Sequence, residues 1–297
     1  MPKIAFGMIV FNGNYVLKEC LESIYPFANQ ILISEGPVSY WQRKGYTTSV
    51  DGTNDVLHEF YDPDNKIKIV HGQFEEKDEQ CNAYMKHLKD ENEFIWNIDS
   101  DEVFKNTDMW TICKLLDEYP ITSVGFKSYS FYGGFDNYLT GFEEAHEFMR
   151  IRRIYPGSYW ATHRPPTIAH KIKNVQPERH LSSDVLWKQC HIRMYHYSYV
   201  FPRQVKEKVS YYKSDISKDN CIDNYFENIY LPWVNGTDQD KKNIEEQWEG
   251  VHEFKPKYRG ECYTAKFDNT HPDVIVKNIE DLKTKYENQL NDLAKRN

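Results

Sequence analysis

The sequence predicts an α/β fold, in which a mostly parallel sheet is flanked by helices and followed by a helical C-terminal extension. First, the N-terminal half of this 297-residue chain alternates short apolar runs with amphipathic helices. Second, the apolar residues of four of these helices share the i, i+3, i+4, i+7 spacing of one helix face. Third, the alternation stops after Pro120, and helical spacing returns toward the C-terminus. Alternating strands and helices are typical of βαβ units joined by right-handed crossovers.

The N-terminal half begins with a continuous apolar run at residues 4–11, as a strand covered on both faces requires. A helix with an apolar face from Leu17 to Ile24 follows and stops near Pro26. Thr53 is expected to cap another helix, because its hydroxyl could accept a backbone N–H. Further strands are predicted at residues 30–34, 66–70 and 93–98, and further helices at 79–88 and after 107.

After Pro120 the pattern changes. Strands of mixed orientation are predicted at 124–131, 148–155 and 191–199, with an irregular segment at 158–189. Helices are predicted at 202–214 and 220–230, and a long one carries an apolar stripe from Ile275 to Leu293. We expect the stripe to pack back on the chain, with a homodimer contact as the alternative.

Composition excludes several classes of protein. With 37 Lys and Arg against 45 Asp and Glu, the net charge of −8 argues against a nucleic-acid binder or a polybasic membrane surface. No apolar run is long enough for a membrane span, and the N-terminus has no signal-peptide pattern. The six cysteines form no C-x-x-C pair, which favours free thiols and a cytoplasmic protein.

The most informative segment follows the strand at 93–98. There the apolar residues lead directly into residues 99–102, Asp-Ser-Asp-Glu. In an open parallel sheet, ligands bind outside the carboxyl ends of the strands. Carboxylates at that edge suit Mg²⁺ or Mn²⁺, which prefer hard oxygen ligands and can bridge diphosphate oxygens. The alternative is a cluster that caps the next helix or forms a solvated turn.

Several segments in this order resemble a family 2-type inverting glycosyltransferase with the GT-A fold, of the lipopolysaccharide-type sugar transferases. The first strand–helix–strand unit resembles the family's nucleotide-binding βαβ. Residues 51–55 resemble its D-G-S-T-D turn, although here 36–50 intervene after the second strand. Residues 74–85 resemble the segment before the aspartate motif, 99–102 the motif itself, and 194–199 the later histidine motif.

The resemblance covers about residues 3–215 and implies a catalytic domain at 1–215, with a nucleotide-binding half at 1–105 and an acceptor half at 106–215. Residues 216–297 would be a helical extension. The implied activity is metal-dependent transfer of a sugar, with inversion, from a nucleotide-diphosphate sugar to a glycan or glycosylated acceptor. UDP is the first expectation for the nucleotide and GDP the second, with Mn²⁺ or Mg²⁺ as cofactor.

The resemblance also implies roles for single residues. Asp101 would be a direct metal ligand and His196 its partner, with Asp99 beside them on the ribose or nucleotide side. A histidine such as His196 is also common as a structural residue. The residues implied around the nucleotide or donor are Phe11, Asn12, Glu35, Lys77, Gln80 and Asp99.

The catalytic base is less clearly marked. Inversion needs a group that takes the proton of the acceptor hydroxyl. Relatives often carry His-Glu after a tryptophan-containing strand, with the Glu as base, whereas here the pair is His163 and Arg164. An arginine there could instead bind a phosphate or an acidic acceptor. The candidate bases are therefore His163 and the carboxylates Glu144, Glu147, Glu143 and Asp136.

Two rival functions remain. A sugar nucleotidyltransferase would need a glycine- and basic-rich phosphate loop after the first strand, but residues 11–14, Phe-Asn-Gly-Asn, contain no basic residue. A non-catalytic glycan-binding module could use the 45 aromatic residues and would not need Asp99 or Asp101.

Overall fold

The computed structural model describes residues 1–216 and 219–295. The chain divides into two compact units, each built from several separate segments. The first unit comprises residues 1–127, 147–194 and 272–274, and the second comprises 128–146, 195–271 and 275–297. These units do not follow the expected boundary between 215 and 216. The second unit takes strands from mid-chain, because β8 (Asn137–Leu139) pairs with β14 (Thr264–Lys266). The expected domains, which rest on the extent of the resemblance, stay a prediction.

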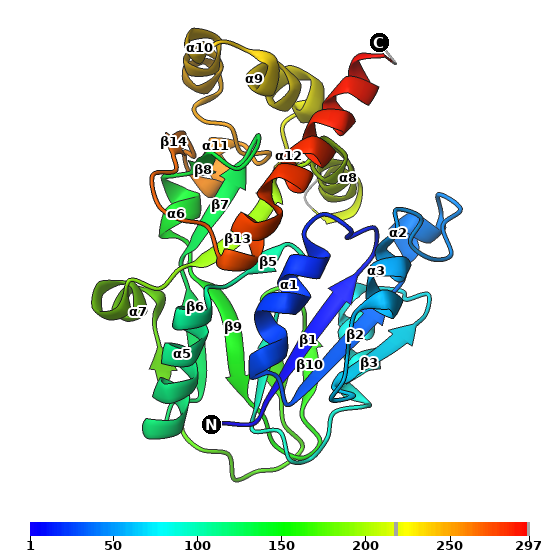
Figure 1. Ribbon diagram of the computed structural model, residues 1–297, viewed down its shortest axis with the longest axis vertical. Coiled ribbons are helices and arrows are strands. Elements are labelled where there is room, and N and C mark those ends of the chain that lie inside the picture. The colour runs from blue at the N-terminus through cyan, green and yellow to red at the C-terminus, as the bar shows by residue number, and fades with distance from the viewer. Residues whose placement is uncertain (217–218, 296–297) are drawn as a thin grey trace. The chain divides into compact units, whose positions relative to one another are not determined.

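The first unit contains a seven-stranded sheet in the order β12-β6-β9-β4-β1-β2-β3. Figure 1 shows β1, β2 and β3 side by side at one end of this order. Its pairs are parallel except where β9 lies antiparallel between β4 and β6. The expected α/β class with a mostly parallel sheet flanked by helices is confirmed. The strands are β1 (Ile4–Val10), β2 (Gln30–Glu35), β3 (Ile67–His71), β4 (Phe94–Asn97), β6 (Ser123–Phe126), β9 (Phe148–Arg153) and β12 (His180–Leu181).

Short elements connect these strands. A small hairpin, β10 with β11, lies outside the large sheet. The remaining elements of this unit are α1 (Leu17–Ile24), the 3-10 turn η1 (Tyr25–Phe27), α2 (Ser39–Gln42), α3 (Thr53–Glu59), α4 (Lys77–Met85), β5 (Glu102–Val103), α5 (Asn106–Glu118), β10 (Tyr159–Thr162), β11 (Thr167–Ala169) and α7 (Ser183–Cys190).

The two faces of the sheet are covered differently because side chains alternate along each strand. On one face, Ala5 and Leu32 pack with Cys81 and Tyr84 of α4. On the opposite face, Phe6 stacks on Trp96 with ring centroids 5.2 Å apart. Burial on both faces explains why these strands are continuous apolar runs.

Several local predictions were wrong. The segment predicted as irregular contains α7, whose first turn is capped by Ser182. The strand predicted at 124–131 is divided between two sheets, and the helix predicted at 220–230 does not begin before residue 225. Thr53 does not cap α3; the Thr53 hydroxyl instead donates to Oδ1 of Asp51 at 2.6 Å, and the N-cap is Gly52 at φ 90°.

The second unit combines a small sheet with the helices of the C-terminal region. Its strands run in the order β14-β8-β7-β13. Its elements are β7 (Ser128–Tyr132), β8, α6 (Phe142–Ala145), β13 (Met194–Tyr199), α8 (Pro202–Tyr211), the π-turns η2 (Tyr212–Ile216) and η3 (Phe226–Tyr230), α9 (Leu231–Asn235), α10 (Asp238–Trp248), α11 (Pro256–Arg259), β14 and α12 (Asp273–Ala294). The expected helical C-terminal extension and long last helix are confirmed.

The core of the second unit is largely aromatic. Tyr132, Tyr225, Tyr230 and Trp233 are all almost fully buried in one cluster. Their polar atoms are paired: the Tyr230 hydroxyl donates to the carbonyl of Val200 at 2.6 Å. Four of the chain's 22 tyrosines lie in this core, where each hydroxyl needs a partner.

Two expectations about composition can be compared with the structure. Among the described residues, no helix is both long and apolar enough to cross a membrane. The six cysteines are unpaired thiols, and Cys20, Cys81 and Cys113 are buried on helices.

Gly36 shows how closely the loops after β2 and β3 approach. Its φ is 142°, and a Cβ built on it would lie 1.8 Å from the carbonyl oxygen of Gly72. Gly36→Ala should therefore destabilise the protein by about 1–3 kcal/mol for the backbone conformation and by about 1–3 kcal/mol more for the overlap. The measurement is the free energy of unfolding in urea.

The matched control is Gly45→Ala. Gly45 also has a positive φ, 90°, but a Cβ there would meet nothing within 4 Å. It should cost only the backbone part, about 1–2 kcal/mol. Equal losses in the two variants would contradict the close approach at Gly36.

Candidate active site at the carboxyl edge of the first sheet

The carboxyl ends of β1, β2, β3 and β4 meet at one edge of the sheet, because these strands are parallel. The loops that follow them are tightly packed. A Cβ on Gly13, after β1, would lie 2.7 Å from the hydroxyl oxygen of Ser100, after β4. The acidic segment therefore lies directly beside the first loop, as the topology predicted.

The acidic segment forms a buried ion cluster with an arginine. Nη2 of Arg150 donates to Oδ2 of Asp99 at 2.9 Å and also to Oε1 of Glu102. The backbone N–H of Asp99 donates to the other oxygen of Glu102 at 3.2 Å. Carboxylate oxygens of Asp99 and Glu102 lie within 4.8 Å of each other. Glu102 is fully buried, whereas Asp99 and Asp101 are partly exposed.

The position of Arg150 follows from strand register. In the antiparallel pair of β4 and β9, Trp96 is opposite Ile151, so Arg150 reaches the end of β4. Burial alone would lower the pKa of Arg150, but Glu102 and Asp99 hold that pKa above its usual range. Sequence reasoning missed Arg150 because its partners are about fifty residues earlier. The only available signal was a charged residue inside a strand.

The residues of this edge fit a hard divalent cation. Asp99, Asp101 and Glu102 offer carboxylate oxygens, the donors that Mg²⁺ and Mn²⁺ prefer, and such ions need only one or two of them beside phosphate oxygens. Residues 99–102 and Arg150 together contain three carboxylates and one guanidinium, a formal charge of −2. The structure brings the carboxylate oxygens of Asp99 and Glu102 together, and Arg150 contacts both.

The loop after β1 is fastened to the segment before α3 by a set of hydrogen bonds, which we call the polar junction. It joins residues 12–14 to residues 49–53. The backbone N–H groups of Asn12, Gly13 and Asn14 donate to the side chains of Ser49, Thr53 and Asp51 at 2.8–3.0 Å. The N–H of Val50 donates to the side chain of Asn12 at 2.9 Å.

Glu35 anchors the same segment from the end of β2. The buried Glu35 carboxylate accepts from the N–H of Ser49 at 2.8 Å, from the hydroxyl of Thr48, and from Nδ1 of His71 at 3.0 Å. Burial alone would raise the pKa of Glu35, but the hydrogen bonds from His71, Ser49 and Thr48 lower it below its usual value. Glu35 is therefore a carboxylate under ordinary conditions.

These contacts refine the roles expected for the first nucleotide-binding residues. Asn12 is 3% exposed and Glu35 is 1% exposed. The polar atoms of Asn12 and Glu35 hold the loops at this edge in place. These two residues would therefore influence a ligand by positioning the loops. Phe11 is half-buried, and its ring lies 5.5 Å from the rings of Trp41 and Tyr46.

Gln80 and Lys77 lie on α4. Nε2 of Gln80 donates to the carbonyls of Ser34 at 3.0 Å and Gly36 at 3.1 Å. At 3% exposure, Gln80 connects α4 to the end of β2. Lys77 begins α4 and is partly exposed. Whether either residue touches a nucleotide stays a prediction.

His163 lies in the first unit, against α4. Its Nδ1 is 3.6 Å from Sγ of Cys81, and its backbone N–H donates to Asp78. Burial, with a smaller effect of Lys77, lowers the pKa of His163 to about 3. An imidazole with a pKa this low is neutral and is a weak base.

The candidate carboxylate bases are in different environments. Glu147 accepts from His180 and from the first N–H of α7, which lowers its pKa despite burial. Glu143 is 3% exposed and accepts from Ser130 and Arg259 inside the second unit. Glu144 is half-buried on α6.

Two further candidates belong to the second unit. Asp136 is exposed before β8. His196 lies on β13 and is 8% exposed. Asp99 and Asp101 belong to the first unit, so the metal partnership of His196 with Asp101 stays a prediction.

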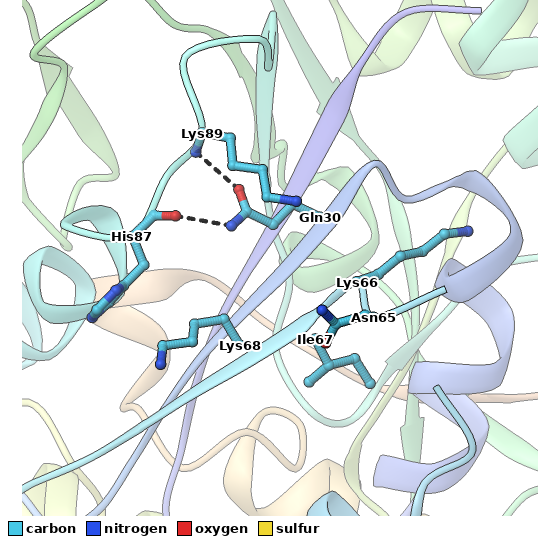
Figure 2. A pocket seen from close by; sticks show the side chains of 7 residues that line it. All are labelled: Gln30, Asn65, Lys66, Ile67, Lys68, His87 and Lys89. Atoms are coloured by element: carbon cyan, nitrogen blue, oxygen red, sulfur yellow. Dashed lines mark hydrogen bonds between the residues drawn. The ribbon is translucent and has the colours of Figure 1, made fainter. Parts of the chain in front are cut away.

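A cavity of about 260 Å³ lies at the opposite, amino end of the sheet, where β2 and β3 begin. Figure 2 shows that Gln30, one of its polar lining residues, is engaged within the protein: its side chain donates to the carbonyl of His87 and accepts from the N–H of Lys89. Lys66 is paired with Asp64 at 3.3 Å. The cavity is separate from the candidate site.

Comparisons with known proteins are weak. No protein-family model and no curated protein matches the sequence. The crystal structure of S. aureus TarS 1-349 in complex with UDP-GlcNAc is 16% identical over 42% of this chain and 35% of that chain, at a TM-score of 0.32. The 4-diphosphocytidyl-2C-methyl-D-erythritol synthase of Anaerococcus prevotii DSM 20548 is 13% identical over 43% of this chain and 56% of that chain, at 0.30. Likenesses at this level decide neither fold nor function.

The anchoring role of Glu35 predicts a pH-dependent contribution to stability. Glu35→Gln should lower the free energy of unfolding by about 1–3 kcal/mol at neutral pH, because an amide would face N–H donors. The folded-state pKa is lowered, so the contribution is complete above the ordinary value of 4.5 and is lost as the pH falls through the lowered value. Denaturant unfolding at several pH values measures this difference.

Glu59→Gln, at an exposed carboxylate of α3, is the control and should change stability by less than about 0.5 kcal/mol. A Glu35→Gln difference that stays constant down to pH 2 would contradict the anchoring role.

Proposed function

We propose that this protein is an inverting glycosyltransferase that moves a sugar from a nucleoside-diphosphate sugar to a glycan acceptor with the help of Mg²⁺ or Mn²⁺. The single observation that supports it best is the pair of neighbouring carboxylates, Asp99 and Glu102, at the carboxyl edge of a mostly parallel sheet, with Asp101 between them in the sequence. Ligands of open α/β sheets bind at that edge. The ordered motifs that resemble the family support the same reaction. UDP is the first candidate nucleotide and GDP the second.

In this proposal, Asp99 and Asp101 hold the cation, and Arg150 contacts Asp99 at 2.9 Å. When bound, the cation supplies positive charge to the departing diphosphate. The polar junction and Glu35 keep the loops that would surround the base and ribose in one conformation. His196 is retained as a candidate additional ligand.

The proposed base takes the proton of the acceptor hydroxyl. At the same time the oxygen of that hydroxyl forms a bond to the anomeric carbon of the sugar, and the bond from this carbon to the diphosphate breaks. His163 is a poor candidate because of its lowered pKa, and Glu147 is engaged by His180 and α7. We propose Glu144 as the base, with Glu143 and Asp136 as the other carboxylates that the resemblance leaves open. No observation favours the nucleotidyltransferase or the glycan-binding module over this reaction.

Nucleotide binding tests the proposal directly. Calorimetric titration should show binding of UDP or GDP that is stronger with Mn²⁺ than with EDTA. Asp101→Asn should weaken the Mn²⁺-dependent binding by about ten-fold or more, the loss expected when one charge–charge contact in a partly exposed site is removed.

Asp90→Asn removes the same charge from an exposed turn at the amino end of the sheet and should leave the binding unchanged. Absence of binding by both nucleotides in the presence of Mn²⁺ would refute the proposed function. Normal affinity in Asp101→Asn would refute the assigned cation site.

Turnover measurements separate the candidate bases. With a nucleotide sugar and an acceptor that the wild type uses, Glu144→Gln should lower kcat by about 10²–10⁴-fold, the usual contribution of a general base. His163→Asn should retain most of the kcat, because a neutral, weakly basic imidazole contributes little. The opposite pattern would assign the base to His163.

A further inference from the structure

Arg150 contacts two of the carboxylates that face the candidate cation site. Its Nη2 donates to Asp99 at 2.9 Å and to Glu102. The Arg150 side chain is 8% exposed and that of Glu102 is fully buried, so water screens the pair little. The same two oxygens would attract a divalent cation.

A neighbouring arginine shows that this arrangement is specific to one position. Arg153 lies on the same strand, three residues on, but it pairs with the half-exposed Glu93 at 3.7 Å, at the other end of β4. Arg150 and Arg153 carry the same charge on β9. Of these two, Arg150 is the one that contacts carboxylates at the carboxyl edge.

We propose that Arg150 is an internal counter-ion that competes with a divalent cation for the carboxylates of Asp99 and Glu102, so that the protein without nucleotide binds the cation weakly. The cation would then enter together with the diphosphate, whose oxygens complete its ligands. This inference rests on the proposed function, which assigns the cation to this edge.

A competing and a purely structural role predict opposite results. If Arg150 only supports the fold of the edge, its removal loosens the carboxylates and weakens cation binding. If Arg150 competes, its removal changes the local charge from −2 to −3 and releases Oδ2 of Asp99. Cation binding then becomes stronger.

The experiment is a titration of the full chain with Mn²⁺ alone, with free Mn²⁺ measured by electron paramagnetic resonance. Arg150→Met should bind Mn²⁺ more tightly than the wild type, by on the order of ten-fold, as one extra charge close to a divalent ion implies. Arg153→Met is the matched control, because it removes the same charge from the same strand, and it should leave the affinity unchanged.

Glu102→Gln provides a second test that keeps the shape of the side chain. It leaves the guanidinium with Asp99 alone and should weaken Mn²⁺ binding by on the order of ten-fold. Arg150→Met combined with Glu102→Gln should return the affinity to the wild-type value. Circular dichroism and thermal unfolding establish that each variant is folded.

The proposal is overturned if folded Arg150→Met binds Mn²⁺ no better than the wild type, or if no variant binds it. If Arg150→Met alone does not fold, the double variant decides: an affinity for Mn²⁺ at the wild-type level supports the proposal, and an affinity as weak as that of Glu102→Gln overturns it. If the affinities follow the expected pattern but UDP and GDP do not bind, the counter-ion stands and the proposed transferase function fails.

Discussion

The ion cluster of Arg150 with Asp99 and Glu102 is the interaction on which the candidate site depends. Burying a carboxylate as completely as Glu102 costs several kcal/mol unless an opposite charge and hydrogen bonds compensate. Arg150 compensates two carboxylates with one nitrogen, and the backbone of Asp99 adds a further hydrogen bond. The antiparallel placement of β9 makes this possible, since a parallel strand with the same sequence would direct Arg150 to the other edge.

Around this cluster, the loops are fixed by side chains that act on backbone groups. Asn12, Glu35 and Gln80 are buried, and each connects two or more loops. Conventional motif reading assigns such residues to a ligand. Their contacts indicate that these residues mainly hold the loops in position. Loop residues with more exposed side chains, such as Phe11, are better placed to contact a ligand.

The sequence predicted most of the fold because burial and periodicity are local signals. The strands from β1 to β4 and the stripe of α12 are evident from spacing alone. The acidic edge was predicted as well, since Asp99 follows an apolar strand. The role of Arg150 was not predicted, because strand register and ion pairs between residues far apart in the sequence produce no periodic pattern. The same limit explains α7, whose cap is visible only once the preceding backbone is placed, and the division into units.

The interleaving of the two units bears on how the chain acquires its structure. In the small sheet, β8 pairs with β7 on one side and with β14 on the other, so this second side of β8 is paired only once Thr264 is present. During synthesis the first four parallel strands can assemble early, whereas this side of β8 stays an open edge until residue 264 has emerged. Such late closure exposes strand edges to wrong pairing. Shortening the chain before β14 would therefore damage a region more than a hundred residues upstream.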